Sequence, residues 1–128
     1  MEIKFTIPLN PVTKKNHGVR GRNGKQFPSK AYQNYEQNAL MLIPCKHIKI
    51  NKPVNVKAVY YTKIDYFKPG CKAVIDLQNL HNALADVLVT AGVLEDDNCR
   101  IVYSMDGSCV RHDKKNPRTE VTITEVEL

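Results

Sequence analysis

Residues 76–92 read DLQNLHNALADVLVTAG and contain the strongest helix signal in the chain. Apolar side chains recur there at three- and four-residue spacing, which places them on one face of a helix. They are Leu77, Leu80, Leu84, Val87, Leu88 and Ala91. Gly92 follows at the position where a left-handed residue ends many helices, and Asp76 stands at the start. The segment therefore predicts an amphipathic helix that begins at an acidic residue.

Segments with alternating apolar and polar residues predict strands with one buried face. These strands are expected at 2–7, 54–60, 100–105 and 120–126, with a tight turn at 106–108. A second helix is expected to begin after Ser29, whose side chain can cap it, and to run to about Ile43. The residues expected on its buried stripe are Tyr32, Tyr35, Ala39 and Leu42.

The order of these elements is strand, loop, helix, strand, helix, strand, strand. It indicates an α+β fold, in which two main helices pack on a mixed or mostly antiparallel sheet. A chain of 128 residues fits a single domain, so residues 1–128 are expected to share one core.

Nineteen Lys and Arg residues against thirteen Asp and Glu give a net charge of +6, which favours a polyanionic partner without proving one. The four cysteines form no C-x-x-C pair, which argues against a zinc site or a compact disulfide framework and predicts reduced thiols. No apolar run approaches the length of a membrane span. We therefore expect a soluble cytoplasmic protein that makes no contact with a membrane.

Residues 13–30 form a polar stretch with glycines, six cations and no acidic residue. The cations are Lys14, Lys15, Arg20, Arg22, Lys25 and Lys30. A solvated connector would explain such a stretch, but the one-sided charge favours a mobile loop that grips DNA phosphates. Phe27 or Tyr32 could wedge into an opened DNA junction, although aromatic residues are more often part of the core.

The carboxylates Asp76, Glu95, Asp96 and Asp97 each have an ordinary structural explanation. Asp76 can cap its helix, and three adjacent acids after a helix usually form a solvated turn. Their chemistry favours a second explanation. A basic protein that binds phosphates gains nothing from exposed acids nearby, unless a divalent cation neutralises them and bridges them to the phosphate. Mg²⁺ prefers such oxygen ligands.

The segments DLQNL at 76–80, TAG at 90–92 and LEDD at 94–97 resemble the core of the RusA-type Holliday-junction resolvases. The pattern of that family is D-L-D-N-L, an amphipathic helix that ends in A-G, then a hydrophobic residue and D-D. The N-terminal strand with its prolines, Asn16 in the basic loop, the helix start at 29–35 and the closing strand at 119–125 also occur in the family's order. The resemblance thus spans nearly the whole chain.

This resemblance implies a homodimeric, metal-dependent endonuclease that binds four-way DNA junctions and introduces paired nicks, in recombination or repair. It implies Asp76 and Asp97 as catalytic carboxylates and Mg²⁺ ligands. We also expect Asp96 to support them as a further metal ligand. Mn²⁺ is an alternative ion, and no small-molecule cofactor is expected. A prophage or phage origin is compatible with these features.

The sequence departs from the family pattern at two positions. Gln78 replaces the middle Asp, and Asn82 replaces a helical Lys. A Gln amide oxygen can bind Mg²⁺ but lacks charge, so Asp96 or Asp106 is expected to compensate. Lys72 or Lys68, just before Asp76, is expected to supply the missing phosphate-contacting cation.

The spacing of Asp76 and Asp97 constrains how they can meet. A helix over residues 78–91 is about 21 Å long, at 1.5 Å per residue. The next six residues, 92–97, span at most roughly 20 Å. Within one chain the carboxylates could meet only by a nearly straight return path, unless Asp76 lies on a bent entry segment. We therefore hypothesise a site that joins Asp76 of one subunit to Asp97 of the other.

Three further possibilities remain open. His81 is either a plain surface residue or a group that assists the site as a general base or a supporting partner. A noncatalytic protein that binds branched DNA, with Gln78 as the mark of a decayed metal site, is the main rival function. An RNA-binding module is the second rival, although the sequence contains no aromatic run typical of single-strand platforms.

Overall fold

A five-stranded mixed sheet forms one layer of the protein in the computed structural model, which describes residues 1–14, 19–20, 26–27 and 29–128. Side chains are described for 1–14 and 29–128. The strands of the sheet are β1 (Glu2–Ile7), β4 (Val54–Thr62), β5 (Val102–Ser104), β6 (Cys109–His112) and β7 (Arg118–Glu125). β7 lies between β1 and β4 and is antiparallel to both. β5 and β6 run parallel to β4 along its other edge.

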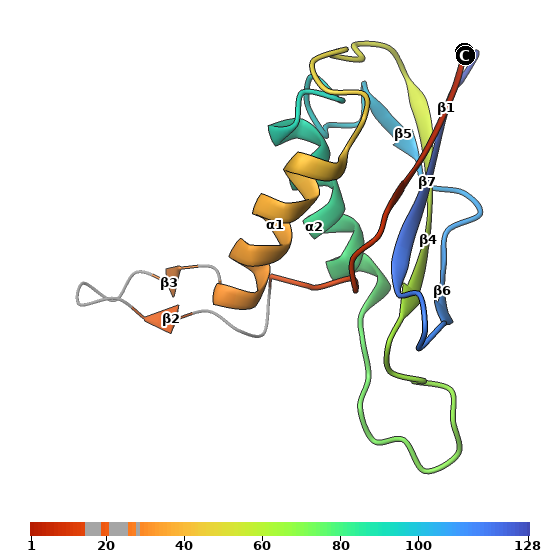
Figure 1. Cartoon of the computed structure of the whole chain (residues 1–128). Coiled ribbons are helices and arrows are strands. Elements are labelled where there is room, and N and C mark those ends of the chain that lie inside the picture. The colour runs from red at the N-terminus through yellow and green to blue at the C-terminus, as the bar shows by residue number, and fades with distance from the viewer. Residues whose placement is uncertain (15–18, 21–25, 28) are drawn as a thin grey trace.

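The helices α1 (Lys30–Leu42) and α2 (Leu77–Thr90) lie side by side on one face of this sheet (Figure 1). Alternate residues of β4 face them and are buried, namely Val54, Val56, Ala58, Tyr60 and Thr62. The residues between these point to the opposite face, which carries polar side chains such as Lys57 and Glu120. The expected α+β architecture, with two main helices on a mixed sheet, is confirmed.

Helix α1 begins as its sequence predicts. The Ser29 side chain accepts a hydrogen bond from the backbone N–H of Tyr32 at 3.1 Å, which confirms the cap. Tyr32, Tyr35 and Ala39 are buried as expected, but Leu42 is 45% exposed. Ile43 takes its place in the core, because the backbone becomes extended there and turns the Ile43 side chain inward.

Helix α2 ends at the left-handed Gly92 (φ 77°). The N–H of Gly92 donates to the carbonyl of Val89 and the N–H of Val93 to that of Leu88, which is the Schellman arrangement. A Cβ at Gly92 would lie 3.0 Å from the Cα of His47, so the close approach also requires glycine. This ending directs the chain toward residues 95–98.

The strand predictions for the C-terminal third were wrong in part. β5 starts at Val102 rather than near residue 100, because the carbonyl of Asn98 accepts the N–H groups of Ile101 and Val102 and forms a turn there. β6 was not predicted at all. Its last residues, Arg111 and His112, are both exposed, so the strand lacks the alternation that reveals a half-buried strand.

The predicted loop at 13–30 contains a short antiparallel pair, β2 (Val19–Arg20) and β3 (Gln26–Phe27). Strands of two residues are too short for a periodic pattern to reveal them. All four cysteines are free thiols, as expected. Among the described residues, no helix is both long enough and apolar enough to cross a membrane.

Candidate active site

Asp76 is the residue from which α2 starts, and its side chain is exposed. Its backbone is extended (φ −96°, ψ 118°), and its carboxylate makes no capping hydrogen bond. The contact with Leu80 uses only the backbone carbonyl of Asp76. The interpretation of this carboxylate as a hydrogen-bonding cap was therefore wrong, and its oxygens remain available to a ligand.

The residues on either side of Asp76 anchor it. Ile75 and Leu77 are partly buried and line an open apolar groove of about 440 Å³. The groove lies between α2, β6 and the segment of the chain that leads to Asp76. The groove is also lined by Tyr66, Phe67, Val74, Ser108, Cys109 and Val110. Since the chain is extended at this point, two inward side chains hold Asp76 pointing outward between them.

His81 lies one turn further along α2 and contacts the central strand. Its Nδ1 is 2.7 Å from the hydroxyl oxygen of Tyr60, and the centres of the two rings lie 5.4 Å apart. Burial lowers the pKa of this imidazole, which favours its neutral form. His81 is thus no plain surface histidine, since it ties the first turns of α2 to β4. Tyr60 was expected only as part of the strand 54–60, and no feature of the sequence indicated that it would be the partner of His81.

The acidic turn that follows α2 distinguishes Asp96 from Asp97. Asp96 accepts a hydrogen bond from the backbone N–H of Asp97 at 2.7 Å and another from the Asn98 side chain at 3.1 Å. Both of its carboxylate oxygens are therefore used within the turn. Asp97 is exposed, and its carboxylate has no partner among the described residues. Of the two, Asp97 is the one whose carboxylate makes no hydrogen bond within the turn, and the role of Asp96 as a metal ligand stays a prediction.

Asp76 directly precedes α2, whereas Asp97 belongs to the segment after its last residue, Thr90, so the two lie at opposite ends of the helix. The helix has 14 residues, which corresponds to about 21 Å. Asp106 lies in the turn after β5, where its backbone N–H donates to Asn55 on the sheet face away from the helices. In the part of the chain that the structure describes, no group of three His, Cys, Asp or Glu side chains could hold a metal ion. Within one chain, the described residues therefore do not bring Asp76 and Asp97 together in one metal-binding cluster.

Gln78 and Asn82, which replace an acid and a lysine of the family pattern, are both exposed on α2. Lys68 and Lys72 are exposed in the segment that leads to Asp76. Both lysines precede Asp76 in the chain, and their role as phosphate contacts stays a prediction.

The structure describes only some of the residues that were expected to bind DNA from the 13–30 loop. Lys14 forms an ion pair with Asp86 of α2 and lies 4.9 Å from the centre of the Tyr32 ring, so its charge already has partners. Tyr32 is only 1% exposed, which makes the DNA-wedge hypothesis wrong for this residue. Lys30 is exposed at the first position of α1. Lys15, Arg22 and Lys25 lie outside the described residues, as do the side chains of Arg20 and Phe27.

A sequence model of the family described as "Endodeoxyribonuclease RusA" matches residues 8–124. The chain belongs to the RusA family. A search of curated proteins found no match. The RusA match includes both helices, the Asp76 segment, the acidic turn and nearly all of β7. RusA membership identifies an endodeoxyribonuclease fold, and within it Asp76 and Asp97 offer exposed carboxylates without partners among the described residues.

Proposed function

We propose that this RusA-family protein is a Mg²⁺-dependent endonuclease that binds four-way or other branched DNA junctions. It resolves them by paired hydrolysis of phosphodiester bonds, in recombination or repair in the cytoplasm. The observation that carries the proposal is the exposed Asp76 carboxylate, which its helix does not use, in the D-L-x-N-L segment of an endodeoxyribonuclease family.

The active site is shared between two copies of the chain in this proposal. Asp76 of one copy and Asp97 of the other supply the catalytic carboxylates, and Asp96 supports Asp97 by holding its backbone N–H. The opposite positions of the two residues along α2 support this arrangement. A twofold homodimer also suits a four-way junction, which presents two equivalent strands for cleavage. Mg²⁺ bound there would lower the pKa of a water molecule and neutralise phosphate charge.

Lys72 and Lys68, together with the basic residues of the 13–30 loop, hold DNA phosphates in this proposal. Lys30 is exposed and open to such contacts, whereas Lys14 must first leave Asp86. Gln78 replaces an acidic side chain and weakens the attraction for a divalent ion. We therefore expect a higher requirement for Mg²⁺ than a site with three acids would have, and activity with Mn²⁺ as well.

The decisive experiment uses a labelled synthetic four-way DNA junction with Mg²⁺, with Mn²⁺ and with EDTA. We expect paired nicks that require the metal ion. Asp76→Asn and Asp97→Asn should each lower the cleavage rate by more than about 100-fold, since even residues that only support metal ligands cost 10- to 100-fold. Glu127→Gln removes an exposed carboxylate elsewhere and should cleave like the wild type.

A noncatalytic protein that binds branched DNA is the second candidate, and Gln78 is the observation that favours it. It predicts salt-sensitive binding of the junction without nicks in either metal ion. Preference for RNA over the DNA junction would contradict both candidates.

A further inference from the structure

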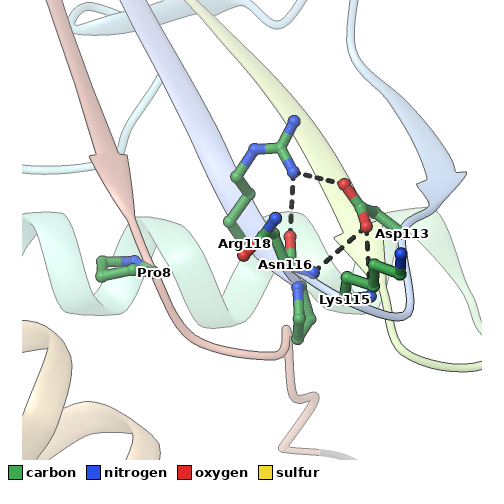
Figure 2. A pocket seen from close by; sticks show the side chains of 6 residues that line it. Pro8, Asp113, Lys115, Asn116 and Arg118 are labelled. Carbon is green, nitrogen blue, oxygen red and sulfur yellow. Dashed lines mark hydrogen bonds and ion pairs between the residues drawn. The ribbon is translucent and has the colours of Figure 1, made fainter.

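Residues 113–118 comprise the turn between β6 and β7 together with Arg118, the first residue of β7, and are called the basic turn below. Hydrogen bonds among these residues fix its shape. One oxygen of Asp113 accepts the backbone N–H groups of Lys115 and Asn116, at 3.2 and 3.1 Å. The guanidinium of Arg118 donates to the other oxygen at 2.8 Å and to the carbonyl of Asn116 at 2.9 Å (Figure 2). The basic turn therefore has a defined shape before it meets any ligand.

Arg118 is itself held on two further sides. Its Nε donates to Glu120 at 3.0 Å, and the guanidinium lies 3.8 Å from the centre of the Tyr61 ring. The hydrogen bond from Arg118 lowers the pKa of the Asp113 carboxyl, so this acid stays ionised and paired. The charge of Arg118 is thus used inside the protein, and Arg118 acts as a positioning residue.

The lysines of the basic turn are in a different situation. Lys114 and Lys115 are exposed, and neither has an ion-pair partner among the described residues. Lys115 also borders an open pocket of about 480 Å³ whose other lining residues include Pro8 and Pro117 (Figure 2). Two unpaired cations on a rigid turn beside an open hollow are suited to bind phosphate groups.

The basic turn lies at the end of the sheet from which the chain leads to Asp76. The N–H of Asp113 donates to the carbonyl of Thr62, the last residue of β4. The segment 63–76, which we call the connector, starts at the next residue and ends at Asp76 (Figure 1). Six exposed cations on these two neighbouring segments and on β6 have no acidic partner in the described part of the chain. They are Lys63, Lys68, Lys72, Arg111, Lys114 and Lys115.

The acids at this end are mostly engaged. Asp113 and Glu120 bind Arg118, and Asp65 accepts the backbone N–H of Phe67 at 3.1 Å and lies 3.8 Å from His112. Asp76 is the exposed exception. At the opposite end of α2 the charges are mixed, because the acids Glu95 to Asp97 lie close in the chain to Arg100, and the backbone of Glu95 bonds Ile50 in a lysine-bearing segment. The unbalanced positive charge is therefore a property of the end that carries Asp76.

We propose that the basic turn and the connector form a second DNA-binding surface, separate from the 13–30 loop, which holds the phosphate backbone of a duplex arm next to Asp76. The inference rests on the proposed function. Lysines on two loops bind phosphates as point charges without reading bases, so this surface orients an arm and selects no sequence. The rigid turn loses little conformational freedom on binding, which favours the contact.

The test measures junction binding by fluorescence anisotropy over a range of salt concentrations, in EDTA and in the Asp76→Asn background so that no cleavage occurs. Lys114→Gln/Lys115→Gln is compared with Lys46→Gln/Lys49→Gln, which removes two exposed lysines near the other end. We expect the first pair alone to make the slope of log affinity against log salt shallower by about 1.8, with affinity roughly 10- to 100-fold weaker at 0.1 M salt.

Lys114→Arg/Lys115→Arg keeps both charges and should retain the parental slope, and thermal melting confirms that each variant is folded. If Lys114→Gln/Lys115→Gln has the same slope of log affinity against log salt as Lys46→Gln/Lys49→Gln, the second surface is overturned and the proposed function stays intact. Failure of the parent protein to bind the junction would instead overturn the proposed function itself.

Discussion

At the scale of single residues, His81 connects stability to pH. Burial lowers the pKa of its imidazole in the folded protein, so the unfolded chain takes up a proton first as the pH falls through about 6.5. The contribution of His81 to stability is complete above the unfolded pKa and is lost as the pH falls toward the folded pKa.

We therefore predict that the free energy of unfolding of the wild type falls more steeply between pH 7.5 and 5 than that of His81→Gln. Gln keeps a polar group near the Tyr60 hydroxyl and does not titrate. Urea denaturation at a series of pH values measures both proteins. Equal pH slopes would show that protonation of His81 does not oppose folding.

The candidate site could be predicted only in part, because the sequence motif identifies residues but not the contacts that they make. The motif indicated Asp76 and Asp97, but no pattern shows that Asp96 spends both oxygens on its own turn. Lys14 belonged to a one-sided run of charge, yet its partner Asp86 lies 72 positions away in the chain. Contacts between distant segments depend on how helices pack, which a local pattern does not contain.

At the scale of elements, the two helices start in different ways. Ser29 caps α1 with its side chain, whereas the Asp76 carboxylate makes no such bond to α2. We predict that Ser29→Ala lowers the free energy of unfolding by about 1 kcal/mol. Asp76→Asn should change it by only a few tenths of a kcal/mol, because only the attraction between charge and helix dipole is lost. Urea denaturation of both variants is the measurement, and a larger loss for Asp76→Asn would contradict a free carboxylate.

The end of α2 offers a second comparison. Gly92 and Gly70 both have a positive φ, but a Cβ at Gly92 meets the backbone of His47, whereas at Gly70 nothing lies within 4 Å. Alanine at either position costs about 1–2 kcal/mol of backbone strain. We predict a clearly larger destabilisation for Gly92→Ala, measured by urea denaturation. A Gly70→Ala variant of equal or lower stability would show that contact with His47 adds nothing.

Elements whose apolar residues recur with a clear period could be predicted, whereas elements without such a pattern could not. The 3.6-residue repeat and Gly92 located α2 almost to the residue. β6 gave no such signal, since an edge strand can expose consecutive residues, here Arg111 and His112. The order of the strands also stayed beyond prediction, because pairing brings together segments from the two ends of the chain.

At the scale of the whole molecule, the proposed function uses a dimer, in which the length of α2 separates the two carboxylates of each chain. If Asp76 and Asp97 of different chains cooperate, a heterodimer of Asp76→Asn and Asp97→Asn chains contains one intact site. We predict that this mixture nicks the junction at one strand, although each variant alone is inactive. Co-expression with two purification tags isolates the heterodimer for the assay.

A second heterodimer distinguishes sites that are shared between the chains from sites that each chain builds alone. A wild-type chain paired with an Asp76→Asn/Asp97→Asn chain has no intact site if the sites are shared, but has one if each chain builds its own. Nicking by this heterodimer, together with none by the first, would show that each chain carries a complete site.

The position of β7 has a consequence for synthesis. It is the last strand along the chain, yet it fills the space between β1, the first strand, and β4. During synthesis on the ribosome, β1 and one edge of β4 therefore lack their pairing partner until residues 118–125 have emerged. The sheet can therefore be completed only after β7 has been synthesised, and a polypeptide stalled before β7 exposes the strand edges of β1 and β4 that β7 would cover.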